Sequence, residues 1–171
     1  MTMTSQQSPS QTIGPMYGFA LYEKGMERAV TPDEAGAVHI RGSVLDGDGE
    51  PLAHPDALVE VWLGDQFTRA RTDAFGEWQV WIRKPTEGVR LPDGTTLAPY
   101  LHATVFARGL LKQAETRIYF PDEAAANAVD PVLARVPESR RHTLIAVPEP
   151  DGALRFDIRL QGEDETVFFD F

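Results

Sequence analysis

The chain has 171 residues, of which 42% are hydrophobic and 25% charged, so it is long enough for one substantial core and too short for two ordinary domains. Acidic residues outnumber basic ones by 26 to 16, and the resulting formal charge of -10 disfavours a nucleic-acid partner because a phosphate backbone would be repelled. The chain has no cysteine, which excludes disulfides and thiolate metal sites.

The first residues do not have the pattern of a signal peptide. Met1–Gln7 lacks a basic region and an apolar run of signal-peptide length, and no stretch of the sequence approaches 18 apolar residues. Residues 1–11 are rich in Ser, Gln and Thr, a composition that buries little surface. These features predict a soluble, cytoplasmic protein with a polar N-terminal segment.

Residues 12–36 read as an irregular arm. In Thr12-Ile13-Gly14-Pro15 the glycine permits a positive φ and the proline fixes its own φ at about -65°, so a defined bend is expected there. Residues 16–22 are apolar and aromatic, and residues 28–36 form a polar loop. We therefore expect an N-terminal arm over residues 1–36, followed by one domain over residues 37–171.

From Val38 the pattern becomes that of strands. Val38–Val44 alternates apolar and polar residues and leads into the turn signal Asp46–Gly49. Trp78, Val80 and Ile82 fall on one face of another such segment, which is typical of a core strand. The other predicted strands cover residues 57–63, 102–106, 115–119, 143–147, 154–160 and 166–169.

One segment departs from the strand pattern. Asp122 is expected to cap a short helix over residues 124–127, and Asp130-Pro131 is expected to interrupt it. Many short strands with almost no helix predict an all-β fold, a two-sheet β-sandwich with one short helical connector.

Four histidines are available for metal or proton chemistry, but no two lie at the i, i+2 or i, i+4 spacing of a local metal site. His54 in a turn and His142 in a polar connection are expected to be solvated, and His39 is expected to point away from the core. His102 lies in an apolar strand and needs a hydrogen-bond partner if it is buried. A structural histidine is therefore favoured over a metal ligand at this position.

Other common reaction signatures are missing. The sequence has no Gly-x-Ser-x-Gly motif and no glycine-rich phosphate loop. The acidic turn with Asp46, Asp48 and Glu50 lacks the twelfth-position glutamate of an EF-hand, so a solvated turn is preferred to a calcium site.

Arg108 follows an apolar strand and precedes Gly109-Leu110-Leu111, so its side chain can extend from a loop. A guanidinium suits bidentate recognition of a carboxylate. The alternative is a surface charge paired with one of the chain's own acids, and the sequence leaves both interpretations open.

Several of these segments resemble the intradiol ring-cleaving dioxygenases. The strands around Pro99–Gly109 and Thr116–Pro121 are similar to the pair that carries the family's His-x-His iron ligands, and residues 38–44, 57–62 and 72–78 are similar to its sandwich core. Other segments resemble the alpha subunit of those members that contain two kinds of chain, namely residues 12–15, 107–111, 140–146 and 162–171.

The resemblance also carries an expectation about iron. In this family the catalytic beta chain holds Fe(III) through two tyrosinates and two histidines. His102 matches the second histidine, but Tyr100 stands at the first, and no tyrosine occurs between Tyr22 and Tyr100, where both tyrosine ligands would fall. Leu97-Ala98 replaces the Arg-Pro that precedes the histidines in beta chains. By resemblance, this chain is expected to have no metal ligand and no catalytic residue.

The resemblance implies a role beside a catalytic partner. The expected partner is an Fe(III)-bearing beta subunit in an alpha-beta hetero-oligomer that cleaves protocatechuate with O2 to 3-carboxy-cis,cis-muconate, a step of aromatic catabolism in the beta-ketoadipate pathway. Thr12, Gly14 and Pro15 match the arm segment that borders the substrate, and Arg108 matches an arginine near that pocket. These four are the expected substrate-binding residues.

Two other interpretations remain at this stage. One is a metal-free β-sandwich that serves as a binding or scaffold module without a dioxygenase role, because a fold alone does not fix a function. The other is an autonomous, homo-oligomeric intradiol dioxygenase, which the missing ligands disfavour.

Overall fold

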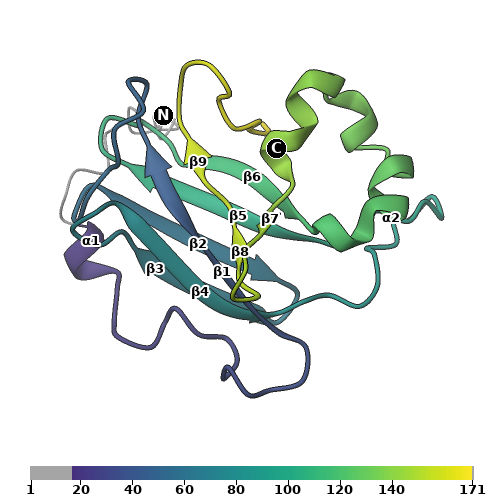
Figure 1. Cartoon of the computed structure of the whole chain (residues 1–171), viewed down its shortest axis with the longest axis horizontal. Coiled ribbons are helices and arrows are strands. Elements are labelled where there is room, and N and C mark those ends of the chain that lie inside the picture. The colour runs from purple at the N-terminus through teal and green to yellow at the C-terminus, as the bar shows by residue number, and fades with distance from the viewer. Residues whose placement is uncertain (1–16, 171) are drawn as a thin grey trace, which may run out of the picture.

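The structure is a computed structural model that describes residues 17–170, and it consists mainly of strands in two sheets (Figure 1). The strands are β1 (Ala37–Leu45), β2 (Ala57–Leu63), β3 (Gln66–Arg71), β4 (Glu77–Arg83), β5 (Tyr100–Ala107), β6 (Ala114–Tyr119), β7 (Val147–Pro148), β8 (Leu154–Arg155) and β9 (Ile158–Arg159). The helices are α1 (Tyr17–Ala20) and α2 (Ala124–Val129), with 3-10 helices over Pro121–Glu123, Leu133–Arg135 and Glu138–Leu144. Among the described residues, no helix is long and apolar enough to cross a membrane.

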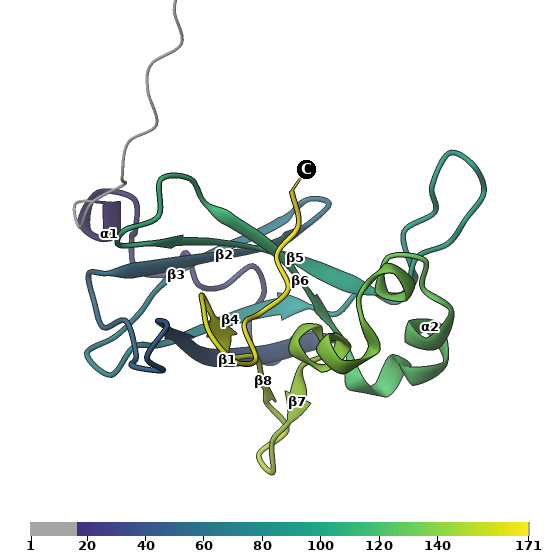
Figure 2. The same ribbon diagram turned by 90° about the horizontal axis from the view of Figure 1, so that it is seen from above.

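The two sheets lie face to face, as the β-sandwich prediction requires. One sheet has the order β4-β1-β8-β7, with β9 also pairing with β1, and the other has the order β3-β2-β5-β6. Figure 2 shows the sheets as separate layers, with α1 at one end of the molecule and α2 and its neighbouring 3-10 helices at the other. The fold predicted from the strand pattern is therefore confirmed.

The core lies between the sheets and follows the alternation of the sequence. Trp78, Val80 and Ile82 of β4 are buried on one face, as predicted, and Ala103 and Val105 of β5 meet them from the other sheet. Side chains that alternate with these point outward, because successive residues of a strand face opposite sides. The outer face of β5 therefore presents Tyr100, His102 and Thr104 on the side away from this core.

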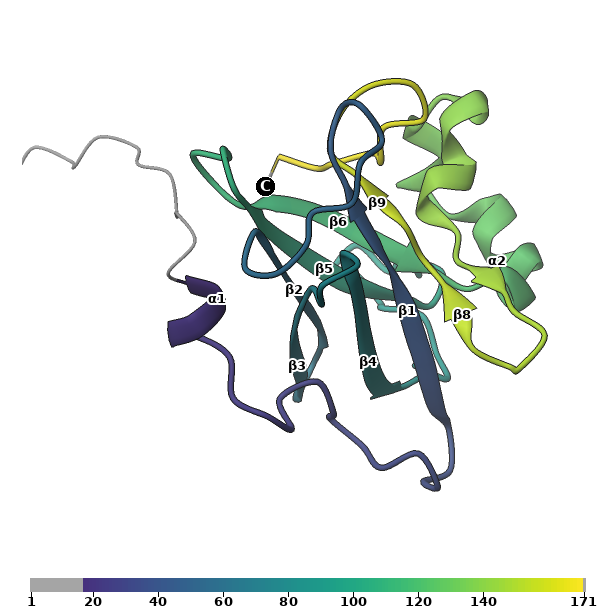
Figure 3. The same ribbon diagram turned by 60° about the vertical axis from the view of Figure 1, so that its left-hand side comes forward.

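β1, the first strand of the chain, pairs with short strands from near the C-terminus, β8 and β9. β1 pairs with β4 in antiparallel fashion but with β8 and β9 in parallel (Figure 3). The backbone approaches closely at Gly42, where an added Cβ would lie 1.9 Å from the carbonyl oxygen of Phe156. Only glycine leaves room for this approach.

The sequence missed one strand and placed others where the chain is irregular. β3 was not predicted, because its charged side chains hide the alternation of buried Thr68 and Ala70. The strand expected over residues 143–147 is wrong for its first half, since a 3-10 helix continues to Leu144. Residues 154–160 form two short strands instead of one, and residues 166–169 form only an isolated bridge between Phe169 and Glu115.

The helical connector is longer than expected and is held differently. α2 extends to Val129, and Asp122 does not cap it, because the Asp122 carboxylate instead accepts a hydrogen bond from Lys84 at 2.6 Å. Asp130 does end the helix, as predicted, but its side chain is buried. That buried carboxylate belongs to a network that reaches the outer face of β6.

Candidate functional site

Aromatic and polar side chains from three neighbouring strands meet on the outer face of β5. The strand register places Trp62 of β2, His102 of β5 and Arg117 of β6 side by side. The imidazole of His102 stacks on Trp62 with ring centroids 4.2 Å apart, and its Nε2 shares a hydrogen bond of 3.3 Å with the Tyr100 hydroxyl. Tyr100 is thus the partner expected for a histidine in an apolar strand.

Arg117 is a buried cation among aromatic rings. Its side chain is 7% exposed, and its Cζ lies 4.1 Å from the ring centroid of Tyr100 and 5.6 Å from that of Phe169. Its Nη1 donates a hydrogen bond of 3.3 Å to the Tyr119 hydroxyl. Both tyrosine rings therefore stabilise the guanidinium, one through its face and one through its oxygen.

The network continues inward to Asp130. The Tyr119 hydroxyl donates to Oδ1 of Asp130 at 3.3 Å, and the main-chain N–H groups of Ala98, Val132 and Leu133 donate to the same carboxylate at 2.8 to 2.9 Å. Four hydrogen bonds thus satisfy this buried carboxylate. Asp130 therefore ties the helical connector to the sheet beneath it.

The ionisation of these groups is set mainly by burial. Burial raises the pKa of the Tyr100 phenol and strongly raises that of Tyr119, so both hydroxyls remain protonated at neutral pH. Burial, and then the charge of Arg117, lower the pKa of the His102 imidazole, so this ring is favoured in its neutral form. The cluster holds one fixed positive charge, on Arg117, beside neutral rings.

The donor set does not fit a ferric ion. The Fe(III) site that the sequence resemblance implies uses two phenolates and two imidazoles, whereas here two protonated phenols and one imidazole lie together with a guanidinium. Within residues 17–170, no group of three or more His, Asp or Glu side chains is placed to hold a metal ion. No reaction step is therefore assigned to this cluster.

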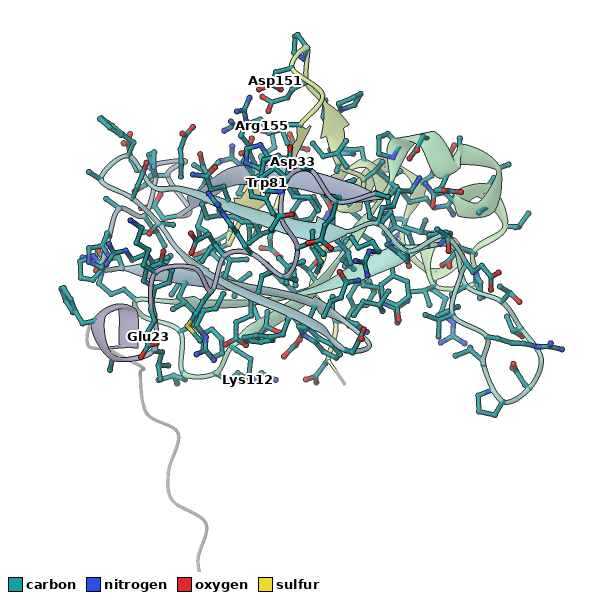
Figure 4. The ribbon with its side chains drawn as sticks, turned by 90° about the horizontal axis from the view of Figure 1, so that it is seen from below. Glu23, Asp33, Trp81, Lys112, Asp151 and Arg155 are labelled. Carbon is teal, nitrogen blue, oxygen red and sulfur yellow. The ribbon has the colours of Figure 1, made fainter. Side chains whose placement is uncertain are left out.

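A groove opens beside His102. It has a volume of about 720 Å³, with Trp62 and His102 on one side and the C-terminal residues on another. Lys112 lies at this groove and pairs with Asp170 at 2.8 Å, on the opposite side of the molecule from Trp81 and Arg155 (Figure 4). The remaining lining residues are Leu110, Gln113, Ala114, Glu115, Leu160, Phe168 and Phe169.

Arg108, the sequence-predicted substrate contact, lies elsewhere. It follows the last residue of β5, which places it about 20 Å along the strand from His102 at 3.4 Å per residue. Its side chain is 65% exposed, and its Nη1 lies 3.0 Å from Oδ2 of Asp56. The ion pair considered from the sequence is thus present, while most of the guanidinium stays accessible.

The described part of the arm lies at the same end of the molecule, because Phe19 contacts the loop that pairs with Arg108. Thr12, Gly14 and Pro15 lie outside the described residues, but α1 follows them directly and its Phe19 packs edge-on against His54 at 4.9 Å. The loop with His54 and Asp56 therefore contacts both the start of the described chain and Arg108.

The other histidines lie away from the groove. His39 stacks on Trp81 on the outer face of its sheet, pointing away from the core as predicted, and His142 lies 3.5 Å from Asp164 at the surface. His54 departs from the expectation of a solvated residue, because its Nδ1 is buried and has no hydrogen-bond partner among the described residues. It lines a second hollow of about 630 Å³ together with acids and arginines.

The sequence did not point to Arg117, Tyr119 or Asp130 as a connected group. Arg117 reads as an ordinary polar position of an alternating strand, and Asp130 reads as a helix breaker before a proline. The alternation of the strand could have indicated part of this group. Arg117 and Tyr119 alternate with Thr116 and Ile118, so they share the outer face with His102.

Solved structures share the fold at low sequence identity. The dioxygenase domain of a carbohydrate-binding fusion protein from Streptomyces sp. SirexAA-E matches with a TM-score of 0.56 and 19% identity over 92% of this chain and 99% of that one. Hydroxyquinol 1,2-dioxygenase from Pseudomonas putida DLL-E4 matches with a TM-score of 0.57 and 16% identity over 94% and 68% of the two chains. A comparison with models of protein families gives no match.

Two curated relatives are much more similar in sequence. The protocatechuate 3,4-dioxygenase alpha chain of Burkholderia cepacia is 39% identical over an alignment of 201 residues that covers 98% of each chain. The protein of the same name from Pseudomonas putida is 40% identical over 198 residues, with 96% of each chain covered. Both alignments are longer than the 171 residues of this chain, so they contain insertions relative to it. Identity of this extent shows that the chain belongs to the family of protocatechuate 3,4-dioxygenase alpha chains.

Proposed function

We propose that this chain is the non-catalytic alpha subunit of a protocatechuate 3,4-dioxygenase. It pairs with a beta subunit that carries Fe(III), and the alpha-beta hetero-oligomer cleaves protocatechuate with O2 to 3-carboxy-cis,cis-muconate. The observation that carries the proposal is the set of side chains around His102. The chain belongs to a family of dioxygenase subunits, but these side chains do not suit Fe(III). The iron of the partner would supply activation of the bound catecholate toward O2.

The contribution of this chain is to shape and charge the entrance to the partner's site. Arg108 attracts and orients the substrate carboxylate, because its guanidinium offers two parallel donors and 65% of its side chain is exposed. An enzyme built from chains as acidic as this one needs such a local cation for an anionic substrate.

The N-terminal arm supplies the second part of this entrance. We assign the arm to residues 1–36, in contact with the beta subunit, and the dioxygenase-like sandwich to residues 37–171. Thr12, Gly14 and Pro15 border the substrate in this proposal, with shape fixed by the Gly-Pro bend. Support comes from the shared position of Arg108 and α1 beside the loop of His54 and Asp56.

The first test is to measure iron in the chain alone and in the chain co-expressed with its candidate beta partner. A complex that contains iron, shows a tyrosinate-to-iron absorption band and consumes O2 with protocatechuate is the expected result. The chain purified alone is expected to show neither the iron nor the band. Stoichiometric iron in the lone chain would contradict the assignment of the metal to the partner.

The proposal has two further consequences for the cell. The enzyme belongs to aromatic catabolism through the beta-ketoadipate pathway, and it works in the cytoplasm, consistent with a chain that has no cysteine. The competing role, a metal-free binding or scaffold module, would be favoured if co-expression produced no complex and no ring cleavage.

A further inference from the structure

We propose that Arg117 is a built-in cation that excludes metal ions from the His102 site. The chain is then kept metal-free by a fixed positive charge as well as by missing ligands. This inference concerns only the described residues of this chain, so it can fail or succeed independently of the function proposed above.

Arg117 is fixed in place by its neighbours. Its guanidinium contacts the faces of Tyr100 and Phe169 and donates to Tyr119. Tyr119 in turn donates to Asp130, which three main-chain N–H groups hold. A buried cation with this support does not swing out to make room for an ion.

The charge of Arg117 lies beside the two side chains that a metal would have to bind, Tyr100 and His102. Tyr100 and His102 share a hydrogen bond, and the guanidinium packs on the ring of the same Tyr100. Arg117 also stands directly opposite His102 in the strand register. Its charge lowers the pKa of His102, so the same charge opposes any other cation at that imidazole.

An arginine cannot relieve this repulsion by losing its proton. The guanidinium remains protonated in proteins under all ordinary conditions. Glu115 also affects His102, with the opposite sign, but ranks after Arg117 among the charges that shift its pKa. The fixed charge beside the imidazole therefore opposes the binding of metal ions.

Tyr100→His would place a second histidine beside His102 and so tests the role of Arg117. A histidine at position 100 would share a strand face with His102, and such an i, i+2 imidazole pair binds divalent copper. If missing ligands were the whole barrier, Tyr100→His alone would create a copper site. If Arg117 is a barrier as well, copper binding at this pair strengthens when the charge at residue 117 is also removed.

The test is a Cu²⁺ titration of the full chain, read by calorimetry and by the nitrogen hyperfine pattern in electron paramagnetic resonance. The variants are Tyr100→His, Tyr100→His with Arg117→Gln, and Tyr100→His with Arg117→Lys, each compared with the unaltered chain. The Gln double variant is expected to bind one additional Cu²⁺ at least tenfold more tightly than Tyr100→His. The Lys double variant, which keeps the charge, is expected to resemble Tyr100→His.

Equal Cu²⁺ affinity in all three variants would overturn the proposal, and so would the lack of an additional copper site in the Gln double variant. Circular dichroism and thermal unfolding establish that each variant is folded. If the Gln side chain disrupts the aromatic cluster, Arg117→Met provides a neutral side chain of similar length, and the same tenfold gain over Tyr100→His is then expected of it.

Discussion

The Nη1 atom of Arg108 lies 3.0 Å from Oδ2 of Asp56, and the main-chain N–H of Arg108 donates to the Asp56 carbonyl oxygen at 2.8 Å. These two contacts hold the end of β5 on the loop whose His54 also contacts Phe19 of the arm. A substrate carboxylate would therefore share the guanidinium with Asp56, using its remaining donors.

Replacing Arg108 by alanine should reduce the kcat/KM of the assembled enzyme for protocatechuate by roughly 10- to 100-fold. The reason is that a hydrogen bond to a charged group contributes about 1.5–3 kcal/mol. Oxygen uptake measures the rate, and iron content and assembly should not change. Lys112→Ala removes a more exposed cation of the same loop and is the matched control, with kinetics expected to stay near those of the unaltered enzyme.

Deleting residues 1–15 should lower kcat/KM in the assembled enzyme while changing the free energy of unfolding of the isolated chain by less than about 1 kcal/mol. Such a polar segment contributes little to the core, because its composition buries little surface. Steady-state kinetics and urea unfolding measure the two effects separately. Unchanged kinetics in a correctly assembled, truncated enzyme would contradict a role for Thr12, Gly14 and Pro15.

Asp130→Ala should destabilise the chain by at least about 3 kcal/mol, because three main-chain N–H groups and the Tyr119 hydroxyl lose their buried acceptor. Urea unfolding of the full chain measures this loss. Asp122→Ala is the control, since Asp122 is an exposed acid in an ion pair with Lys84, and its removal should cost at most about 1 kcal/mol. Similar losses in both variants would show that the Asp130 network stabilises little.

Gly42→Ala should cost about 3 kcal/mol or more, because the backbone of β1 or of Phe156 must move to admit a Cβ. Gly64→Ala provides a comparison: nothing lies within 4 Å of the added Cβ there, and only its φ of +61° is unfavourable, which costs about 1–2 kcal/mol. Thermal unfolding should rank the two variants in this order, and the reverse ranking would argue against the close approach at β1.

Stability should fall as the pH drops from about 6.5, in part because of His54. Burial, and then the charge of Arg71, lower the pKa of the imidazole in the folded chain below its usual value of 6.5. Between the lowered and the usual pKa the unfolded chain binds more protons, so folding is less favourable at the acidic end. His54→Gln should flatten this part of the profile, measured as the free energy of unfolding at pH 5 and at pH 7.5. Parallel profiles for the two proteins would contradict the shift.

The sequence predicted those parts of the fold in which burial and alternation coincide. Val38–Val44 and the face with Trp78, Val80 and Ile82 were identified because their apolar residues are the core residues. β3 was missed because its outward positions include arginines, and one of these, Arg69, pairs with Glu60 of β2 at 2.6 Å. Such a pairing depends on the strand register and is not visible in a local pattern.

In the candidate site, too, some features could be predicted from the sequence and others depend on contacts between distant segments. The mismatch of Tyr100 and His102 with an iron-binding pair could be identified from the sequence by resemblance, and the structure adds their mutual hydrogen bond. The burial of Arg117 could not be predicted, because it depends on Phe169, which contacts Arg117 from a segment far along the chain. Thr12, Gly14 and Pro15 remain predictions from the sequence.

The parallel pairing of β1 with β8 and β9 has a consequence for biosynthesis. Ser43 of β1 donates its main-chain N–H to the Asp157 carboxylate, a contact that spans 114 residues. A growing chain on the ribosome therefore cannot complete this sheet until nearly the whole domain has emerged, and the edge of β1 stays open until then. Open edges of this kind promote association between incomplete chains, so rapid capture of that edge by the last strands protects the newly made subunit.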